Sequence, residues 1–257
     1  MELKQAAIIA HRGASALVSF ENTIEAFEKA IEIGADAMEF DVRRTRDGVL
    51  VSFHDEAVGG EKIADLSFDG LQAIAAGRGF AVPTIEEIFT MARGRIFLDI
   101  ELKEAGYEGE IVALAMKHLE VGGFVMTSFL DRVIIAVKRI EPRIVTGLLL
   151  GLDKPKEGIL RRLVELFPGF RLRRCRSDFV APNYQLLLLG FLARMRRIGM
   201  PVFVWTVNDP AMIERLLASG VHSVITDRPD IGLGIARKLQ NEASRGDPPG
   251  LHSPIGR

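Results

Sequence analysis

Short apolar segments with the length of a β-strand recur eight times along this chain, and segments with helical periodicity separate them. The apolar segments are residues 6–10, 37–42, 95–100, 123–128, 144–150, 178–181, 201–207 and 222–226. A strand followed by a helix and then by another strand favours parallel pairing, because the connection must cross back over the sheet. Eight such units in about 240 residues are typical of a closed (β/α)8 barrel rather than of an open doubly wound sheet.

The intervening segments have the apolar periodicity of surface helices. In residues 23–33, apolar side chains recur at intervals of three and four and mark one face of a helix. We expect further helices at residues 108–119, 130–140, 160–167, 186–198, 211–219 and 231–240.

One segment interrupts the alternation. Residues 49–55 form an apolar run directly after Asp47-Gly48, a pair that is typical of hairpin turns. We therefore predict an α/β fold, a TIM barrel with a small β-hairpin insertion after strand 2. Residues 1–240 form this single domain, and the Gly-, Pro- and Ser-rich residues 241–257 form a disordered tail.

The charge composition limits the classes of partner that this chain is expected to bind. The 257 residues carry 33 basic and 34 acidic side chains, so no overall positive field favours nucleic acid or an anionic membrane. Cys175 is the single cysteine, which excludes an intrachain disulfide. The apolar run near the N-terminus is too short for a signal peptide or a membrane span, so we expect a cytoplasmic protein with a small-molecule substrate, no stable membrane insertion and no nucleic-acid partner. The arginine-rich residues 171–177 are interpreted as a solvated loop.

Polar residues collect where the predicted strands end, which is where barrel enzymes position their catalytic groups. They are His11, Arg12, Glu39, Asp41, His54, Glu101, Lys103 and Trp205. Successive side chains of a strand alternate in direction, so Glu39 and Asp41 point to one side, and so do Glu101 and Lys103.

Three inward carboxylates, those of Glu39, Asp41 and Glu101, would repel one another in a mouth of low polarity. A hard divalent cation with oxygen ligands relieves this repulsion, which predicts a site for Mg²⁺ or Ca²⁺. For any one of these acids a salt bridge is an equally good explanation, whereas for all three together a metal site is favoured.

The remaining candidates suit a phosphate ester. Histidine is the side chain whose ordinary pKa is nearest to neutrality, so His11 and His54 could act as general acid and base. Arg12 and Lys103 could hold the phosphate oxygens, and the alternative for each is an ion pair with a nearby carboxylate. Trp205 could form an apolar wall for the glycerol or alcohol part of a substrate, while Phe53 is better explained as core.

Several motifs, in their order and spacing, resemble the glycerophosphodiester phosphodiesterase family. They are HRGAS at 11–15, ENTIEAFEKAIEIGAD at 21–36, EFDVRRTRDGVLVSFHD at 39–55, ELK at 101–103, VWTVND at 204–209 and GVHSVITDRPD at 220–230. The resemblance extends from the first predicted strand to the last helix.

The resemblance implies a (β/α)8 barrel that hydrolyses glycerophosphodiesters to an alcohol and sn-glycerol 3-phosphate. It implies that His11 and His54 are the acid–base pair. It also implies that Glu39, Asp41 and Glu101 are ligands for Mg²⁺, Ca²⁺ or Mn²⁺, and that Arg12 and Lys103 contact the phosphate. Our hypothesis for the mechanism is that a metal-bound glycerol hydroxyl attacks phosphorus internally, and that water then opens the cyclic phosphate. Asn22 of the ENT motif is interpreted as a loop-fixing or helix-capping residue.

The chain departs from the family pattern at three places. Phe20 replaces the usual proline before ENT, residues 56–67 form a shortened segment, and His222 replaces a common aspartate. The shortened segment lies where a head group would be recognised, so the preferred substrate stays open. A lysophospholipase D or sphingomyelinase D-like phosphodiesterase is the first alternative, and a non-catalytic barrel that binds glycerophosphoryl groups is the second.

Overall fold

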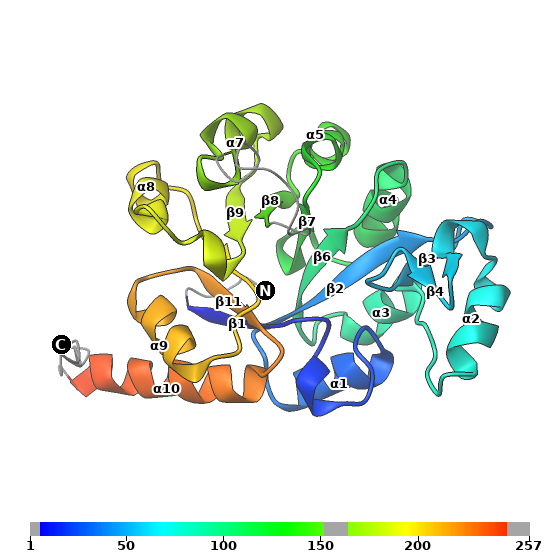
Figure 1. The fold of residues 1–257 in the computed structure, drawn as a ribbon, viewed down its shortest axis with the longest axis horizontal. Helices are drawn as coiled ribbons and strands as arrows, with labels where there is room; N and C mark the ends of the chain where they lie inside the picture. The colour runs from blue at the N-terminus through cyan, green and yellow to red at the C-terminus, as the bar shows by residue number, and fades with distance from the viewer. Residues whose placement is uncertain (1–5, 152–163, 246–257) are drawn as a thin grey trace.

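The computed structural model describes residues 6–151 and 164–245, and its centre is a barrel of eight parallel strands (Figure 1). Each of the eight predicted strand segments overlaps one of these strands, and β2, β6 and β9 extend one or two residues past the predicted ends. In their order around the barrel they are β10 (Phe203–Val204), β11 (Ser223–Thr226), β1 (Ala7–Ala10), β2 (Ala37–Arg44), β6 (Phe97–Leu102), β7 (Phe124–Ser128), β8 (Val145–Leu150) and β9 (Phe179–Pro182).

The first and last strands of this order are joined by two isolated parallel bridges, Val180 to Val202 and Asn183 to Trp205. They bring β9 next to β10, so the predicted (β/α)8 barrel is confirmed. The rings of Phe179 and Phe203 stack inside it with their centroids 4.1 Å apart.

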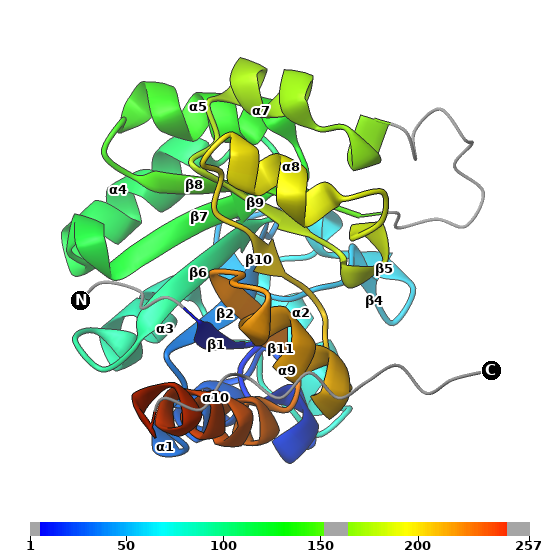
Figure 2. The same cartoon turned by 90° about the vertical axis from the view of Figure 1, so that its left-hand side faces the viewer.

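Helices surround the strands, as Figures 1 and 2 show. They are α1 (Ile24–Glu32), α2 (Phe68–Ala76), α3 (Ile85–Ala92), α4 (Glu108–His118), α5 (Asp131–Ile140), α7 (Gly169–Cys175), α8 (Phe191–Arg197), α9 (Pro210–Ala218) and α10 (Pro229–Arg245). Local sequence sets several of their starts: the side chain of Thr23 accepts a hydrogen bond from the Ala26 amide, and Thr84 and Glu87 form a capping box.

The predicted hairpin insertion is present. Strand β3 (Leu50–Ser52) pairs antiparallel with β2, and a small ribbon of β4 (Ala57–Val58) and β5 (Glu61–Lys62) follows it. Helices α2 and α3, which the sequence analysis did not predict, continue this excursion. Together these elements bury a small apolar cluster that includes Val51, Leu71 and Val82, and it supports one side of the barrel mouth.

Three expectations about helices require correction. The arginine-rich residues 171–177 are not a solvated loop, because most of them belong to α7, whose Leu172 and Cys175 are buried. Helix α8 starts only at Phe191, since Gly190 adopts a left-handed conformation with φ 70° and a short 3-10 helix occupies residues 184–186. The last helix continues past residue 240 to Arg245, so the predicted tail began too early.

Parts of two predictions lie outside the described residues. Residues 160–163 of an expected helix and residues 246–257 of the expected tail belong to these parts. Within the described ranges, no helix combines the length and the apolar character that crossing a membrane requires.

Candidate active site

Three buried carboxylates lie at the mouth of the barrel, on two neighbouring strands. Asp41 of β2 is directly opposite Glu101 of β6, and Glu39 is two residues before Asp41 on the same side. Each of the three offers one oxygen atom, and these oxygens all lie within 4.8 Å of one another. Glu39, Asp41 and Glu101 are 4%, 1% and 8% exposed, so water solvates their negative charges only weakly.

Two cations contact this triad. The Nζ atom of Lys103 lies 2.7 Å from Glu101 Oε1 and 3.2 Å from Asp41 Oδ1, and Arg12 Nε lies 3.4 Å from Asp41 Oδ2. Burial opposes the charged form of Asp41, yet Lys103 and Arg12 together lower the pKa of Asp41 to about 2. The ion pairs that the sequence analysis weighed as alternatives are therefore present.

Glu39 is the member of the triad with the least compensation. Burial raises the pKa of Glu39 well above its ordinary value, and the nearby charges of Asp41 and Glu101 raise it further. Burial also raises the pKa of Glu101, although Lys103 opposes this shift. Glu39 and Glu101 thus both resist ionisation, because the nearby positive charges do not fully offset burial and the repulsion between the carboxylates.

The triad fits a divalent cation. One oxygen of each carboxylate is buried without a hydrogen-bond partner among the described residues: Glu39 Oε1, Asp41 Oδ1 and Glu101 Oε1. Lys103 lies within ion-pair distance of the last two, but without hydrogen-bond geometry. Three converging carboxylate oxygens are the ligand type that Mg²⁺ and Ca²⁺ prefer.

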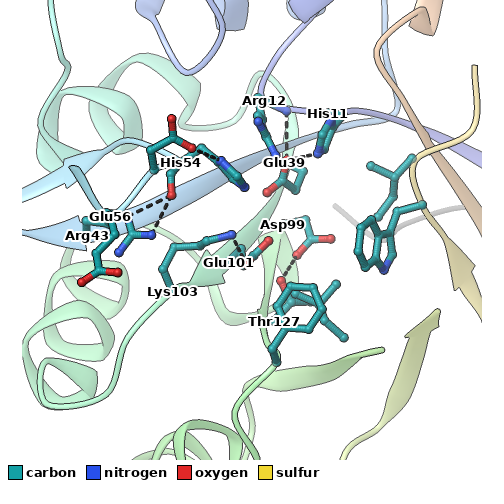
Figure 3. Close-up of a pocket in the computed structure, with 15 residues that line it drawn as sticks. His11, Arg12, Glu39, Arg43, His54, Glu56, Asp99, Glu101, Lys103 and Thr127 are labelled. Atoms are coloured by element: carbon teal, nitrogen blue, oxygen red, sulfur yellow. Dashed lines mark hydrogen bonds and ion pairs between the residues drawn. The ribbon is translucent and has the colours of Figure 1, made fainter. Parts of the chain in front are cut away.

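His11 is oriented by a carboxylate from the far end of the chain. Its Nδ1 atom lies 2.6 Å from Asp227 Oδ1. Its Nε2 atom faces Glu39 Oε2 at 4.0 Å (Figure 3). Burial opposes ionisation of Asp227, yet hydrogen bonds from His11, Asn208 and Ser15 lower the pKa of Asp227 to about 2. A charged Asp227 holds the proton on Nδ1 and leaves Nε2 free to exchange a proton with a ligand.

Sequence reasoning missed Asp227. It lies one residue beyond β11, and β11 pairs with β1 in the register that brings Thr226 next to Ala10. The available signal was the one used elsewhere, namely a polar residue directly after a barrel strand.

His54 follows β3 on another side of the mouth. Its Nδ1 atom lies 2.8 Å from Asp55 Oδ1, and its backbone carbonyl accepts hydrogen bonds from Arg43 Nε at 2.9 Å and Nη2 at 2.8 Å. Arg43, a buried residue that sequence reasoning did not single out, therefore fixes the backbone that carries the imidazole. Burial lowers the pKa of His54, and Lys103 and Arg12 act in the same direction, whereas Asp41 opposes them.

Asn22 supports the triad rather than capping α1, because Thr23 makes the cap. The Asn22 side chain donates to Asp41 Oδ2 at 2.8 Å and accepts from the Asp41 amide at 3.2 Å and from Ser52 Oγ at 2.8 Å. Asn22 has φ 55° and Arg12 has φ 53°, both in the left-handed region. Such strain is retained where surrounding contacts fix a functional loop.

Asp99 is another acid that the sequence analysis missed, and it is 1% exposed. It lies two residues before Glu101 on β6, lines the same pocket, and accepts a hydrogen bond from Thr127 Oγ1 at 2.8 Å (Figure 3). Burial raises the pKa of Asp99 to about 7, although the hydrogen bond from Thr127 opposes the shift. The alternation that aligned Glu101 with Lys103 also aligns Asp99, so the signal was present in the sequence.

These groups surround a pocket of about 310 Å³. Seven of the eight predicted site residues line it. Asp41 does not line the pocket but pairs with two lining residues, Lys103 and Arg12. One wall is apolar and includes Phe129 and Trp205, whose rings meet edge to face at 5.5 Å. The indole N–H of Trp205 donates to the Ala181 carbonyl at 2.7 Å, which fixes the ring against the cavity.

Chemically, the pocket combines a carboxylate triad, two cations and two imidazoles next to an apolar wall. This combination can hold a phosphate group, neutralise charge on its oxygens and move protons on either side of phosphorus.

Known proteins share both the sequence pattern and the fold. Residues 11–231 match the Glycerophosphoryl diester phosphodiesterase family. The chain is 31% identical to a glycerophosphodiester phosphodiesterase of Caldanaerobacter subterraneus over 90% of this chain and 98% of that protein. It resembles the crystal structure of a glycerophosphodiester phosphodiesterase from Thermotoga maritima, with 27% identity, a TM-score of 0.73 and coverage of 90% of this chain and 98% of that one.

A more distant match shows the fold alone. The chain is 21% identical to an Oleispira antarctica phosphodiesterase, with a TM-score of 0.78 and coverage of 91% of this chain and 97% of that one. The structure of that protein is a complex with the product sn-glycerol-3-phosphate.

Proposed function

Because the chain belongs to the glycerophosphoryl diester phosphodiesterase family, we propose that it hydrolyses glycerophosphodiesters to an alcohol and sn-glycerol 3-phosphate, with a divalent cation and two histidines. The observation that carries this proposal is the convergence of His11, His54 and the carboxylate triad on one pocket. The Oleispira antarctica neighbour, which binds sn-glycerol-3-phosphate, supports the identity of the product.

Glu39, Asp41 and Glu101 would hold the cation, as their three buried and unbonded oxygens indicate. A bound Mg²⁺, Ca²⁺ or Mn²⁺ supplies Lewis-acid polarisation of the phosphate and of a neighbouring hydroxyl. Arg12 and Lys103 border the same cavity and add positive charge for the non-bridging phosphate oxygens.

The two histidines divide the proton transfers. Asp227 orients His11 so that Nε2 accepts the proton of the attacking glycerol hydroxyl, and the negative charge of Asp227 stabilises the resulting imidazolium. His54 donates a proton to the alcohol oxygen as its bond to phosphorus breaks. The lowered pKa of His54 makes its protonated form a stronger acid.

The first step forms a cyclic glycerol phosphate, and a water molecule opens it in the second step. The histidines then exchange roles: His54 accepts a proton from water and His11 returns its proton to the glycerol oxygen. Both imidazoles end in their starting states, so the cycle balances. Rapid-quench trapping of a cyclic phosphate tests this order, and its absence in slowed variants would favour direct attack by water.

The test of the activity is metal-dependent release of glycerol 3-phosphate. Glycerophosphocholine, glycerophosphoethanolamine and glycerophosphoglycerol are assayed with Mg²⁺, Ca²⁺, Mn²⁺ or a chelator. We expect release that the chelator abolishes, that His11→Ala abolishes and that His222→Ala, at an exposed histidine away from the pocket, leaves intact. No release from the wild type with any metal would contradict the proposed hydrolysis. That outcome would instead favour a barrel that binds glycerophosphoryl groups without catalysis.

One observation favours a second candidate, a lysolipid substrate. The segment after β9 carries three exposed apolar side chains, Tyr184, Leu188 and Leu189, and its Tyr184 amide donates to the Trp205 carbonyl at 2.8 Å. An acyl chain on the glycerol could leave the pocket past Trp205 and contact this segment. Release of choline from lysophosphatidylcholine faster than from glycerophosphocholine would establish this lysophospholipase D activity.

A further inference from the structure

A second hollow, of about 130 Å³, adjoins the active-site pocket. The two share His54 and Asp55, so His54 lies at the boundary between them. The other residues that line this hollow are Phe20, Glu21, Asn22, Phe53 and Phe80. None of these belongs to the triad or to the acid–base pair described above.

Three aromatic rings from separate segments form one wall of the hollow. Phe80 stacks on Phe20 at 4.9 Å between centroids and on Phe53 at 6.3 Å. Phe20 precedes α1, Phe53 follows β3, and Phe80 lies between α2 and α3. Each ring is only partly buried, so all three keep surface available for a ligand.

The charged groups of the hollow are of one sign. Glu21 and Asp55 are its charged side chains besides His54, and the described residues that line it include no lysine or arginine. Arg12 Nη1 pairs with Glu21 Oε1 at 2.6 Å, whereas the Asp55 side chain is 71% exposed and, among the described residues, accepts a hydrogen bond from His54 alone. Aromatic rings combined with a nearby carboxylate are the chemistry that binds a weakly hydrated cation.

We propose that this hollow is the subsite for the departing alcohol and that it favours a quaternary ammonium group, as in a choline head group. The inference rests on the proposed function and specifies its substrate class. Because the triad and the Trp205 wall lie in the larger pocket, the glycerol and the phosphate occupy that pocket. The alcohol then extends past His54, the residue that protonates it, into the aromatic hollow.

A quaternary ammonium fits better than the alternatives. Its N-methyl groups are apolar and carry the positive charge, so they gain from ring contacts without needing hydrogen-bond acceptors. A primary ammonium would lose hydrogen bonds to water on the side that faces Phe20, Phe53 and Phe80, since these rings offer no acceptor that replaces water. A glycerol head group has no charge to complement Asp55.

Substrate ranking in two ring variants tests the subsite. In the wild type we expect the kcat/KM of glycerophosphocholine to exceed that of glycerophosphoglycerol. Phe20→Leu and Phe80→Leu should each lower kcat/KM for glycerophosphocholine about tenfold, the size of a desolvated cation–ring contact, and change glycerophosphoglycerol turnover less than about twofold. Phe68→Leu is the matched control. Phe68, like Phe80, packs against the apolar cluster that includes Val51, Leu71 and Val82, but it does not line the hollow.

Equal losses for both substrates in the ring variants would assign the rings a structural role only and overturn the subsite. Equal kcat/KM of the wild type for glycerophosphocholine, glycerophosphoethanolamine and glycerophosphoglycerol would overturn the quaternary ammonium preference.

A binding measurement separates this inference from the proposed activity. Saturation-transfer NMR detects contact between the protein and the methyl groups of free choline, whether or not the protein turns over substrate. We expect a choline signal that Phe20→Leu weakens and Phe68→Leu preserves. Choline binding without hydrolysis of any substrate would sink the proposed function alone, while hydrolysis without choline contact would sink the subsite alone.

Discussion

The imidazole Nδ1 atom of His11 lies 2.6 Å from Oδ1 of Asp227, although 216 positions separate the two residues in the sequence. Parallel pairing of β1 with β11 brings them together, since each follows the end of its strand. Ser15 Oγ at 3.0 Å and Asn208 Nδ2 at 2.6 Å also bind the Asp227 carboxylate. The carboxylate is thus fixed before it orients the histidine.

Asp227→Ala should therefore lower kcat/KM roughly 100-fold, because the imidazole loses the group that sets its tautomer and stabilises its charged form. The pH dependence of the residual activity should also change, which a purely structural role would not cause. Asp230→Ala is the control, since Asp230 pairs with Arg228 away from the pocket. A variant of Asp227 with wild-type rate and pH profile would refute the orienting role.

The sequence allowed the eight strands to be predicted, because a buried parallel strand is a short apolar run whatever it pairs with. It also placed His11, Glu39 and Glu101 at the mouth, since residues at strand ends share one face of a barrel. Asp227 was missed although it directly follows a barrel strand, the signal that marked the other residues. Arg43 was missed because its role depends on how the hairpin folds back and brings the His54 carbonyl to its guanidinium.

Some helices escaped prediction for a different reason. Residues 171–177 contain four arginines, yet the buried Leu172 and Cys175 at an interval of three hold this segment against the barrel as α7. Charge content alone therefore misled the interpretation. Helix α2 is short and contains a glycine, which weakens its local signal, and it forms where its Leu71 packs into the cluster beside β3.

Titration of His54 should have a midpoint below the ordinary histidine value of about 6.5. Burial lowers the pKa of His54, and Lys103 lowers it further, so folding favours the neutral ring. The unfolded chain then binds more protons, and this group costs stability as the pH falls below about 6.5. NMR titration of the ring protons checks the midpoint, which Lys103→Met should raise; a midpoint above 6.5 in the wild type would contradict the burial argument.

Lys103→Met should destabilise the protein in the presence of a chelator. The Lys103 side chain is 13% exposed and contacts both Asp41 and Glu101, so its removal takes from Glu101 the cation that lies 2.7 Å away and leaves Asp41 with Arg12 at 3.4 Å. Loss of one partner of a buried ion pair costs roughly 3 kcal/mol of unfolding free energy. Urea unfolding measures this loss, and saturating Mg²⁺ or Ca²⁺ should reduce it if the triad holds the ion.

Lys62→Met provides the reference for that experiment. The exposed pair of Lys62 with Glu56 resembles Lys103 in charge but not in burial, so its loss should change the unfolding free energy by less than about 1 kcal/mol. Equal effects of the two lysine substitutions would show that Lys103 does not stabilise the triad.

Glu39→Gln should separate stability from activity. Burial and the charges of Asp41 and Glu101 raise the pKa of Glu39, so a neutral side chain of the same shape relieves repulsion in the absence of metal. The Arg12 amide can still donate to the remaining carbonyl oxygen, as it now donates to Glu39 Oε2 at 2.9 Å. We expect the unfolding free energy in chelator to stay equal or rise by about 1 kcal/mol, as happens when a strained site is neutralised.

The same change removes a charged oxygen from the proposed metal site and should lower kcat at least 100-fold and abolish the thermal stabilisation that Mg²⁺ or Ca²⁺ confers. Glu28→Gln, at an exposed acid paired with Arg95, should leave both quantities near those of the wild type. Full metal stabilisation in Glu39→Gln would remove Glu39 from the ligand set, and a large loss of stability in chelator would show that its charge is already balanced by the protein.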